Sequence, residues 1–231
     1  MLKEFVEKIL SLDELKQFTI NGRQYTTKPL DSVQNPSPRT LMVHSLTGIV
    51  DYLKSEDHKL TAPIIHIADH ATASVIGPLN TANFMERNIY AQAEHDLPVF
   101  HFGQFYGTEE FNISLQSMFV QDDITAQILK IVGNLKTEDS VITKDNGIAQ
   151  EVTAKTGISM VEKVELPNPV TLRPYRTFRE VGQPASKFIL RMKAGGGCAL
   201  FEADGQQWQL EAIDSIKEFF RVEFPEITII A

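Results

Sequence analysis

The chain has 231 residues, of which 42% are hydrophobic and 23% are charged, and its formal net charge is -8. A chain of this length can bury a substantial core as one large domain or two small ones, and it contains no apolar run near the roughly 20 residues that a membrane span needs. The negative charge argues against general duplex-DNA binding, and the single cysteine, Cys198, excludes an internal disulfide framework and a multi-cysteine zinc site. We therefore expect a cytoplasmic protein.

The first half of the sequence predicts helices interleaved with strands. Apolar residues at three- and four-residue spacing predict an amphipathic helix over residues 2–15, whose mixed charges are unlike those of a signal peptide. Asn21-Gly22 predicts a hairpin with a type I′ turn, and Ser45 is placed to cap a short helix. Two strands are expected around a turn near residues 69–71, and a third strand is expected within residues 83–94.

The middle of the chain predicts two adjacent helices, over about 108–119 and 122–135, and strands dominate from about residue 138. Asn146-Gly147 predicts a further hairpin turn, and an amphipathic helix containing Trp208 precedes a short edge strand. The fold class is therefore α+β, with mixed or antiparallel sheets, interleaved helices, a β-rich second half and a C-terminal helix packed on a sheet. We expect the two halves to be residues 1–136 and 137–231, either separate or integrated in one domain.

Several segments together resemble a known family: "HSLTGIVDYL", "IADHATASVIGPL", "FGQFYGTEEFNISLQSMF", "TAKTG", "RPYRTFREVGQPASKFILRMK" and "ALFEADGQQWQLEAI". The family is an uncharacterised one, a domain of unknown function encoded by tailed bacteriophages and prophages. The similarity runs from about residue 25 to residue 222. It implies a non-virion accessory product, often encoded near replication and recombination genes, and it assigns no catalytic residues.

Positive charge gathers in residues 173–193, which hold six Lys or Arg and a single acid, Glu180. The net charge of this stretch is therefore +5, which leaves -13 on the rest of the chain. Proline and glycine residues favour an irregular loop at its start. Guanidinium groups bind phosphates bidentately, and aromatic rings stack on bases. The residues predicted to bind a phosphate or nucleotide are Arg173, Tyr175, Arg176, Phe178, Arg179 and Arg191.

The segment "KFILRMK" alternates charged and apolar residues, so one face of the expected strand is basic and the other is apolar. Cations on a solvated strand face are common and often have no function. Three interpretations of the basic stretch therefore stay open. Its cations can pair with carboxylates on neighbouring strands or subunits, form an anion or nucleotide site, or belong to a surface for a protein partner.

The histidines suggest a metal site as the alternative. All six fall between His44 and His101, and "HIADH" contains a candidate ligand set of His66, Asp69 and His70. A metal hydrolase needs two or three such side chains converging on one ion. The surrounding sequence is typical of strands, however, and residues four apart in a strand are separated by roughly 13 Å. These histidines are therefore expected at polar positions of half-exposed strands.

Other chemistry has little support in the sequence. No G-x-S-x-G elbow and no phosphate-binding P-loop is present, and no cofactor is predicted. Cys198 enters an apolar strand, where a buried and inert thiol is expected. Trp208, with Phe201 and Phe219, is expected to anchor the last helix on the sheet.

The leading hypothesis is a phage-encoded, non-enzymatic binding protein of the infected cell's cytoplasm. It would bind a nucleotide-type small molecule, a short single strand or a host protein, and so counter host defence or support replication. A metal-dependent phosphoesterase is the first alternative, and an oligomeric assembly protein without a small ligand is the second. A homo-oligomer is expected, with neither duplex DNA nor a membrane as partner.

Overall fold

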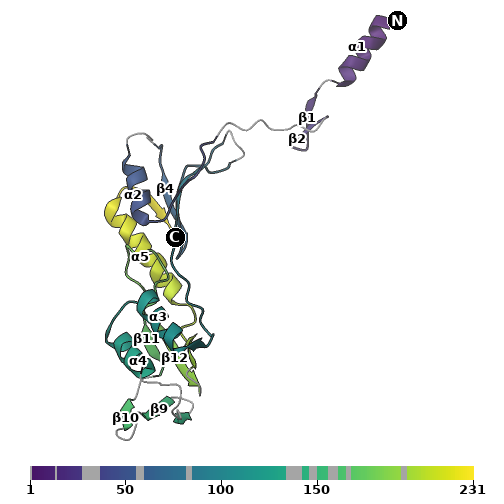
Figure 1. The fold of residues 1–231 in the computed structure, drawn as a ribbon. Coiled ribbons are helices and arrows are strands. Elements are labelled where there is room, and N and C mark those ends of the chain that lie inside the picture. Colours follow the sequence, from purple (N-terminus) through teal and green to yellow (C-terminus); the bar gives the residue numbers. More distant parts are fainter. Residues whose placement is uncertain are drawn as a thin grey trace. The chain divides into compact units, whose positions relative to one another are not determined.

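The structure is a computed structural model that describes residues 2–13, 15–27, 37–55, 60–81, 85–133, 142–145, 150–155, 161–164, 168–193 and 197–231. Two compact units make up the chain, Met1–Ser37 and Pro38–Ala231. Figure 1 shows their elements coloured along the sequence. The predicted boundary between residues 136 and 137 lies outside the described residues and stays a prediction.

The first unit contains one helix and one hairpin. Helix α1 (Leu2–Asp13) is followed by strands β1 (Gln17–Ile20) and β2 (Arg23–Thr26), which pair antiparallel. Asn21 and Gly22 connect these strands with φ angles of 49° and 76°, the left-handed conformation that a type I′ turn requires. The predicted hairpin is therefore confirmed. Every side chain described in this unit is exposed, so the unit has no buried core among its described residues.

A five-stranded sheet forms one part of the second unit, in the order β14-β4-β5-β6-β3. Its strands are β3 (Leu41–Val43), β4 (Ile64–Asp69), β5 (Thr72–Ile76), β6 (Ile89–Glu94) and β14 (Thr228–Ile230). The central strands β4, β5 and β6 are antiparallel, whereas the edge strands β14 and β3 run parallel to their neighbours. The predicted edge strand at residues 227–230 is confirmed in β14.

Helices α2 (Leu46–Lys54) and α5 (Trp208–Glu223) contact this sheet. Alternate strand residues, including Ile65, Ile67 and Val75, are buried with apolar residues of both helices in one core. Ser45 caps α2 as predicted, because its Oγ accepts a hydrogen bond of 3.1 Å from the backbone N–H of Gly48. The C-terminal helix therefore packs on a sheet, as the sequence pattern predicts.

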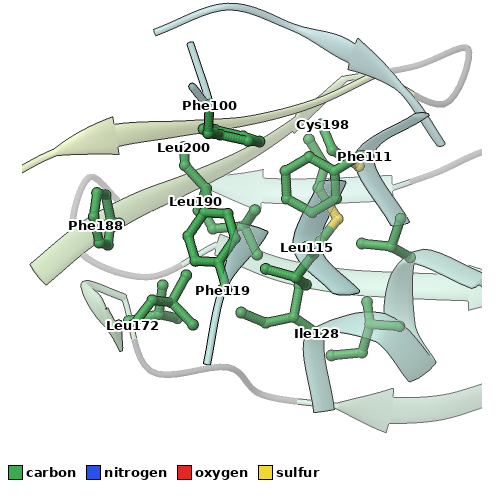
Figure 2. Close-up of a cluster of buried hydrophobic side chains, with 14 residues drawn as sticks. Phe100, Phe111, Leu115, Phe119, Ile128, Leu172, Phe188, Leu190, Cys198 and Leu200 are labelled. Carbon is green, nitrogen blue, oxygen red and sulfur yellow. The ribbon is translucent and has the colours of Figure 1, made fainter. Parts of the chain in front are cut away.

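A four-stranded antiparallel sheet forms the other part of the unit, in the order β11-β12-β13-β7. Its strands are β7 (Tyr106–Gly107), β11 (Val170–Leu172), β12 (Ser186–Lys193) and β13 (Gly197–Glu202). The helices α3 (Thr108–Met118) and α4 (Asp123–Gly133) pack against each other and against one face of this sheet. Figure 2 shows the core between them, where Phe111, Leu115 and Ile128 meet alternate residues of β12 and β13.

A third antiparallel sheet consists of β8 (Ile142–Asp145), β9 (Gln150–Lys155) and β10 (Val161–Val164). The predicted turn at Asn146-Gly147 lies between β8 and β9 and outside the described residues. The fold class is α+β, as predicted. No helix in the described part of the chain is long and apolar enough to cross a membrane.

Candidate functional site

Arg176, one of the predicted phosphate-binding residues, lies inside the molecule with a side chain that is only 10% exposed. Its Nη1 donates to Oε1 of Glu202 at 2.7 Å, and its Nη2 donates to the hydroxyl of Ser186. The guanidinium carbon lies 3.8 Å from the centre of the Trp208 ring. Burial lowers the pKa of Arg176 to about 10, although Glu202 and Asp204 act in the opposite direction. We name Arg176, Glu202, Ser186, Trp208 and His70, whose ring also contacts Trp208, the Arg176 cluster.

Arg173 pairs with a carboxylate of its own chain. Its Nη2 lies 3.3 Å from Oδ2 of Asp122, and its side chain is about half exposed. Asp122 also accepts hydrogen bonds from the backbone N–H groups of Ile124 and Thr125 at the start of α4. Burial would raise the pKa of Asp122, but the hydrogen bonds from Thr125 and Arg173 outweigh it and hold that pKa below its usual value. Arg173 and Asp122 thus connect the basic loop to the beginning of α4.

The loop around Phe178 is folded upon itself by the Gln183 side chain. Gln183 Oε1 accepts from the backbone N–H groups of Arg176 and Thr177, at 2.9 and 3.2 Å. Its Nε2 donates to the carbonyl oxygens of Thr177 and Phe178, at 3.2 and 3.0 Å. Phe178 is consequently 1% exposed and belongs to the core under the five-stranded sheet. The predicted stacking of Phe178 on a ligand is not possible in this conformation.

The remaining predicted residues of the basic loop do not converge on one point. Tyr175 is half-buried, and its backbone N–H donates to the carbonyl of Met118. Arg179 is exposed, and within the part of the chain that the structure describes it has neither a hydrogen bond nor an ion pair. Arg191 is half-buried on β12. The interpretation that the cations pair with carboxylates therefore holds for Arg173 and Arg176, which pair with Asp122 and Glu202.

The candidate metal ligands are held in separate environments. His66 pairs with Ser74 across β4 and β5, on the opposite side of the strand from the buried Ile65 and Ile67. The predicted turn at residues 69–71 is present, and Oδ1 of Asp69 accepts from the backbone N–H of Ala71 at 2.7 Å. The His70 ring instead contacts Trp208 of α5, with 4.6 Å between ring centres. Across the described ranges, no three His, Cys, Asp or Glu side chains are grouped so as to hold a metal ion.

The outer face of the four-stranded sheet, opposite the core with α3 and α4, is basic. Strand β12 buries Phe188, Leu190 and Met192 in that core, so its intervening side chains point to the other face. Lys187 and Lys193 are exposed at the two ends, and Ile189 and Arg191 are half-buried between them. This alternation confirms the predicted basic strand face. Within the described residues, neither Lys187 nor Lys193 has a carboxylate within ion-pair distance.

Two aromatic rings join this basic strand at one end. The Nζ of Lys193 lies 4.3 Å from the centre of the Phe105 ring, which is 43% exposed. Phe201 on β13 meets Phe105 edge-on at 6.3 Å between ring centres. We name Lys193, Phe105 and Phe201 the Lys193 corner, and together with Lys187 and Arg191 they form the basic–aromatic face.

Two glycines allow this corner to form. Lys193 pairs with Gly197 across the β12–β13 hairpin, and a Cβ at Gly197 would lie 2.6 Å from the Cε of Lys193. The lysine side chain therefore lies flat over a position that only glycine leaves open. Gly103 has a φ of 78°, and a Cβ there would touch the Phe201 ring at 3.9 Å. The turn at Gly103 thus brings the loop containing Phe105 beside Phe201.

A cleft of about 500 Å³ lies elsewhere, beside the beginnings of β4 and β14. Its walls are mainly apolar, from Pro63, Leu79 and Ile227, with Arg87 and Glu226 among its lining residues. One guanidinium nitrogen of Arg87 already donates to the carbonyl of Gly77 at 2.8 Å. None of the residues predicted to bind a phosphate or a metal lines this cleft.

The sequence pattern located Lys187, Arg191 and Lys193 on one face but missed the aromatic part of the site. Phe105 precedes α3 by three residues, and its only local signal is the aromatic and glycine-rich segment "HFGQFYG". The sequence predicts that Phe201 helps to anchor the last helix, and in the structure its ring meets Phe105 edge-on. Trp208 is buried as expected, whereas its contact with Arg176 was not anticipated.

Comparison of the chain with protein families, with curated proteins and with solved structures finds no match.

Proposed function

We propose that this protein binds a phosphate-bearing ligand with a stackable ring, a nucleotide-type molecule or a short single strand, on its basic–aromatic face. Cations meet phosphates and aromatic rings meet bases in such sites, and a stacked ring tolerates any base. The ligand class is the one expected from the sequence. The proposed binding residues differ from those predicted from the sequence. The side chains of Arg176 and Phe178 are buried, whereas Lys193 and Phe105 are exposed.

The observation that carries the proposal is the Lys193 corner. An exposed ammonium lies over an exposed aromatic ring, and no carboxylate in the described residues pairs with it. In a chain of net charge -8, a lysine left without an acid can still attract an anion locally. A base that replaces the Lys193 ammonium over the Phe105 ring would bring its phosphate within reach of that ammonium.

The length of the basic strand favours a short single strand over one nucleotide. Lys187 and Lys193 are six residues apart on β12, which corresponds to roughly 20 Å at strand spacing. Arg191 lies between them, so cations follow the strand. A mononucleotide can contact one end of this row, whereas an oligonucleotide can contact its whole length.

The proposed setting is the cytoplasm of a phage-infected cell. It rests on the resemblance of the sequence to the phage family, whose members look like accessory products and are often encoded near replication and recombination genes. A protein that binds a strand or a nucleotide signal without turnover can serve replication, or can remove a signal on which host defence depends.

The test is a binding measurement with labelled oligo-dT of about ten nucleotides, followed by anisotropy at low salt. We expect Lys193→Glu to weaken binding at least about tenfold, since it replaces a phosphate contact with a repulsive charge. Arg179→Glu is the matched control, because it changes the net charge equally at an exposed arginine outside the face. It should change affinity by less than about twofold. Competition with mononucleotides shows whether the face binds a single nucleotide or requires a short single strand.

The proposal fails if the wild-type chain binds neither the oligonucleotide nor any mononucleotide at low salt. It also fails if the two charge reversals weaken binding equally, because binding would then depend only on net charge. Salt dependence gives a second criterion. Contacts from three cations predict a slope of about -2 in a plot of log affinity against log salt concentration.

A further inference from the structure

The first unit exposes apolar surface that no other described residue of the same unit covers. On α1, Phe5 is 63% exposed and Ile9 is 49% exposed, and Val6 is exposed beside them. The hairpin adds Phe18, whose ring stacks on Tyr25 across the two strands at 6.1 Å, and Ile20 is exposed on the same strand. An isolated helix of twelve residues is marginal in water, and most helices are stabilised by burying an apolar face. This arm therefore needs a partner surface.

The spacing of the apolar residues on α1 matches the seam of a coiled coil. Phe5 and Ile9 are four residues apart, and in the sequence Leu2 precedes and Leu12 follows them at intervals of three. Leu2 and Ile9 are then a positions of a heptad, and Phe5 and Leu12 are d positions. Two helices that each carry such a seam can pack against each other, with the a and d side chains of one helix inserted between those of the other.

The charges of the arm also favour a second copy of this chain. Residues 1–37 contain five Lys or Arg and five Asp or Glu, so the arm is neutral, and the remainder of the chain carries the whole net charge of -8. With Leu2 at an a position, Lys8 is a g position and Asp13 is the following e position. In a parallel pair, g and the following e of the partner helix lie side by side, so the heptad pattern of the sequence aligns Lys8 of one copy with Asp13 of the other.

We infer that α1 pairs in parallel with α1 of a second copy and makes the protein a homodimer. A membrane surface fits the arm less well, because helices that bind anionic lipid are rich in Lys and Arg on their polar face. Helix α1 has only Lys3 and Lys8, and these are matched by Glu4 and Glu7. The inference is independent of the proposed ligand, since it concerns residues outside the basic–aromatic face.

Sedimentation equilibrium of the full chain is the test, over concentrations up to about 100 µM because the seam has only two heptads. We expect twice the 26.0 kDa of one chain at the upper end. The double variant Phe5→Glu/Ile9→Glu should sediment as a monomer throughout. Leu210→Glu is the matched control, since Leu210 on α5 is 66% exposed and lies in the other unit. It should leave the dimer unchanged.

A monomeric wild-type chain at every concentration overturns the inference, as does a dimer that survives the double variant. Wild-type monomers that co-sediment with phosphatidylserine vesicles would assign the arm to a membrane instead. The g–e pairing has its own test. Lys8→Glu should weaken the dimer by about two- to fivefold, and adding Asp13→Lys should restore it.

The orientation of the helices is tested with Leu2→Cys. The only native cysteine, Cys198, is buried, and burial raises the pKa of its thiol to about 11, so it contributes no background. Parallel helices place both introduced thiols together and allow a disulfide to form between the two copies under mild oxidation. A dimer that fails to cross-link has antiparallel helices, and the parallel arrangement is then wrong.

Discussion

The Arg176 cluster and the Lys193 corner both place a cation over an aromatic ring, but the two cations are in opposite surroundings. Arg176 is buried, pairs with Glu202 and touches Trp208. Lys193 is exposed, touches Phe105 and has no carboxylate partner among the described residues. A basic and aromatic composition is common to both, so composition does not separate a structural cation from one that is available to a ligand. Burial and the position of the nearest acid distinguish the two kinds of cation.

Substitution of Arg176 is the most direct test of the difference between the two cations. Arg176→Ala removes the ion pair with Glu202 and the contact with Trp208, and we expect the free energy of unfolding to fall by about 1–3 kcal/mol. Urea denaturation measures this change. Lys193→Ala and Arg179→Ala should each change it by less than about 0.5 kcal/mol, because these side chains are exposed. Equal losses for Arg176 and Lys193 would remove the distinction between the two sites.

Substitutions at the ion pair between Arg173 and Asp122 should have the next largest effect on stability. Asp122→Ala removes the acceptor for two backbone N–H groups at the start of α4, and should cost about 1–2 kcal/mol. Arg173→Ala should cost less than about 1 kcal/mol, since its ion pair is half exposed. Asp122→Asn is the informative control. It retains the capping oxygen but loses the charge, so its cost should match that of Arg173→Ala and not that of Asp122→Ala.

Features that depend on neighbouring residues could be predicted from the sequence. Asn21-Gly22 and Ser45 specify their turn and cap through their own backbone and side-chain chemistry. The alternation along β12 predicted which of its side chains are buried. In each case the controlling interaction spans only a few residues.

Features that depend on distant pairing could not be predicted in this way. Arg176 meets Glu202 26 residues away, and Gln183, which fixes the loop around Phe178, has no pattern that marks it. The Lys193 corner combines a loop before α3 with a hairpin far along the chain. Likewise, β14 pairs in parallel with β4 from the opposite end of the unit. A single sequence holds no record of such pairings, and so the basic stretch appeared to be one site.

We expect the stability of the folded chain to depend on pH through His70 of the Arg176 cluster. Burial lowers the pKa of His70, and His95 and Arg176 add to this effect, whereas Asp69 opposes it. As the pH falls below the ordinary histidine value of 6.5, the unfolded chain takes up a proton before the folded chain does. Stability contributed by neutral His70 is therefore lost on acidification. Urea denaturation between about pH 7.5 and 5.5 should show a weaker pH dependence for His70→Gln than for the wild type. Identical slopes would contradict this assignment.

The smallest expected effect is that of Gly197→Ala, which tests how Gly197 positions the side chain of Lys193 in the Lys193 corner. Gly197→Ala places a methyl group where the Lys193 side chain lies, so the lysine must move away from Phe105. The side chain is flexible, and we expect stability to change by less than about 1 kcal/mol. Affinity for the oligonucleotide should fall by about two- to fivefold, in line with the modest strength of an exposed cation–π contact. The decisive measurement is the same substitution in a Lys193→Met background. There it should have no further effect, because the glycine acts only through the lysine. A loss that persists without Lys193 would mean that Gly197 acts through the backbone of β13, and the basic–aromatic face would then need a different description.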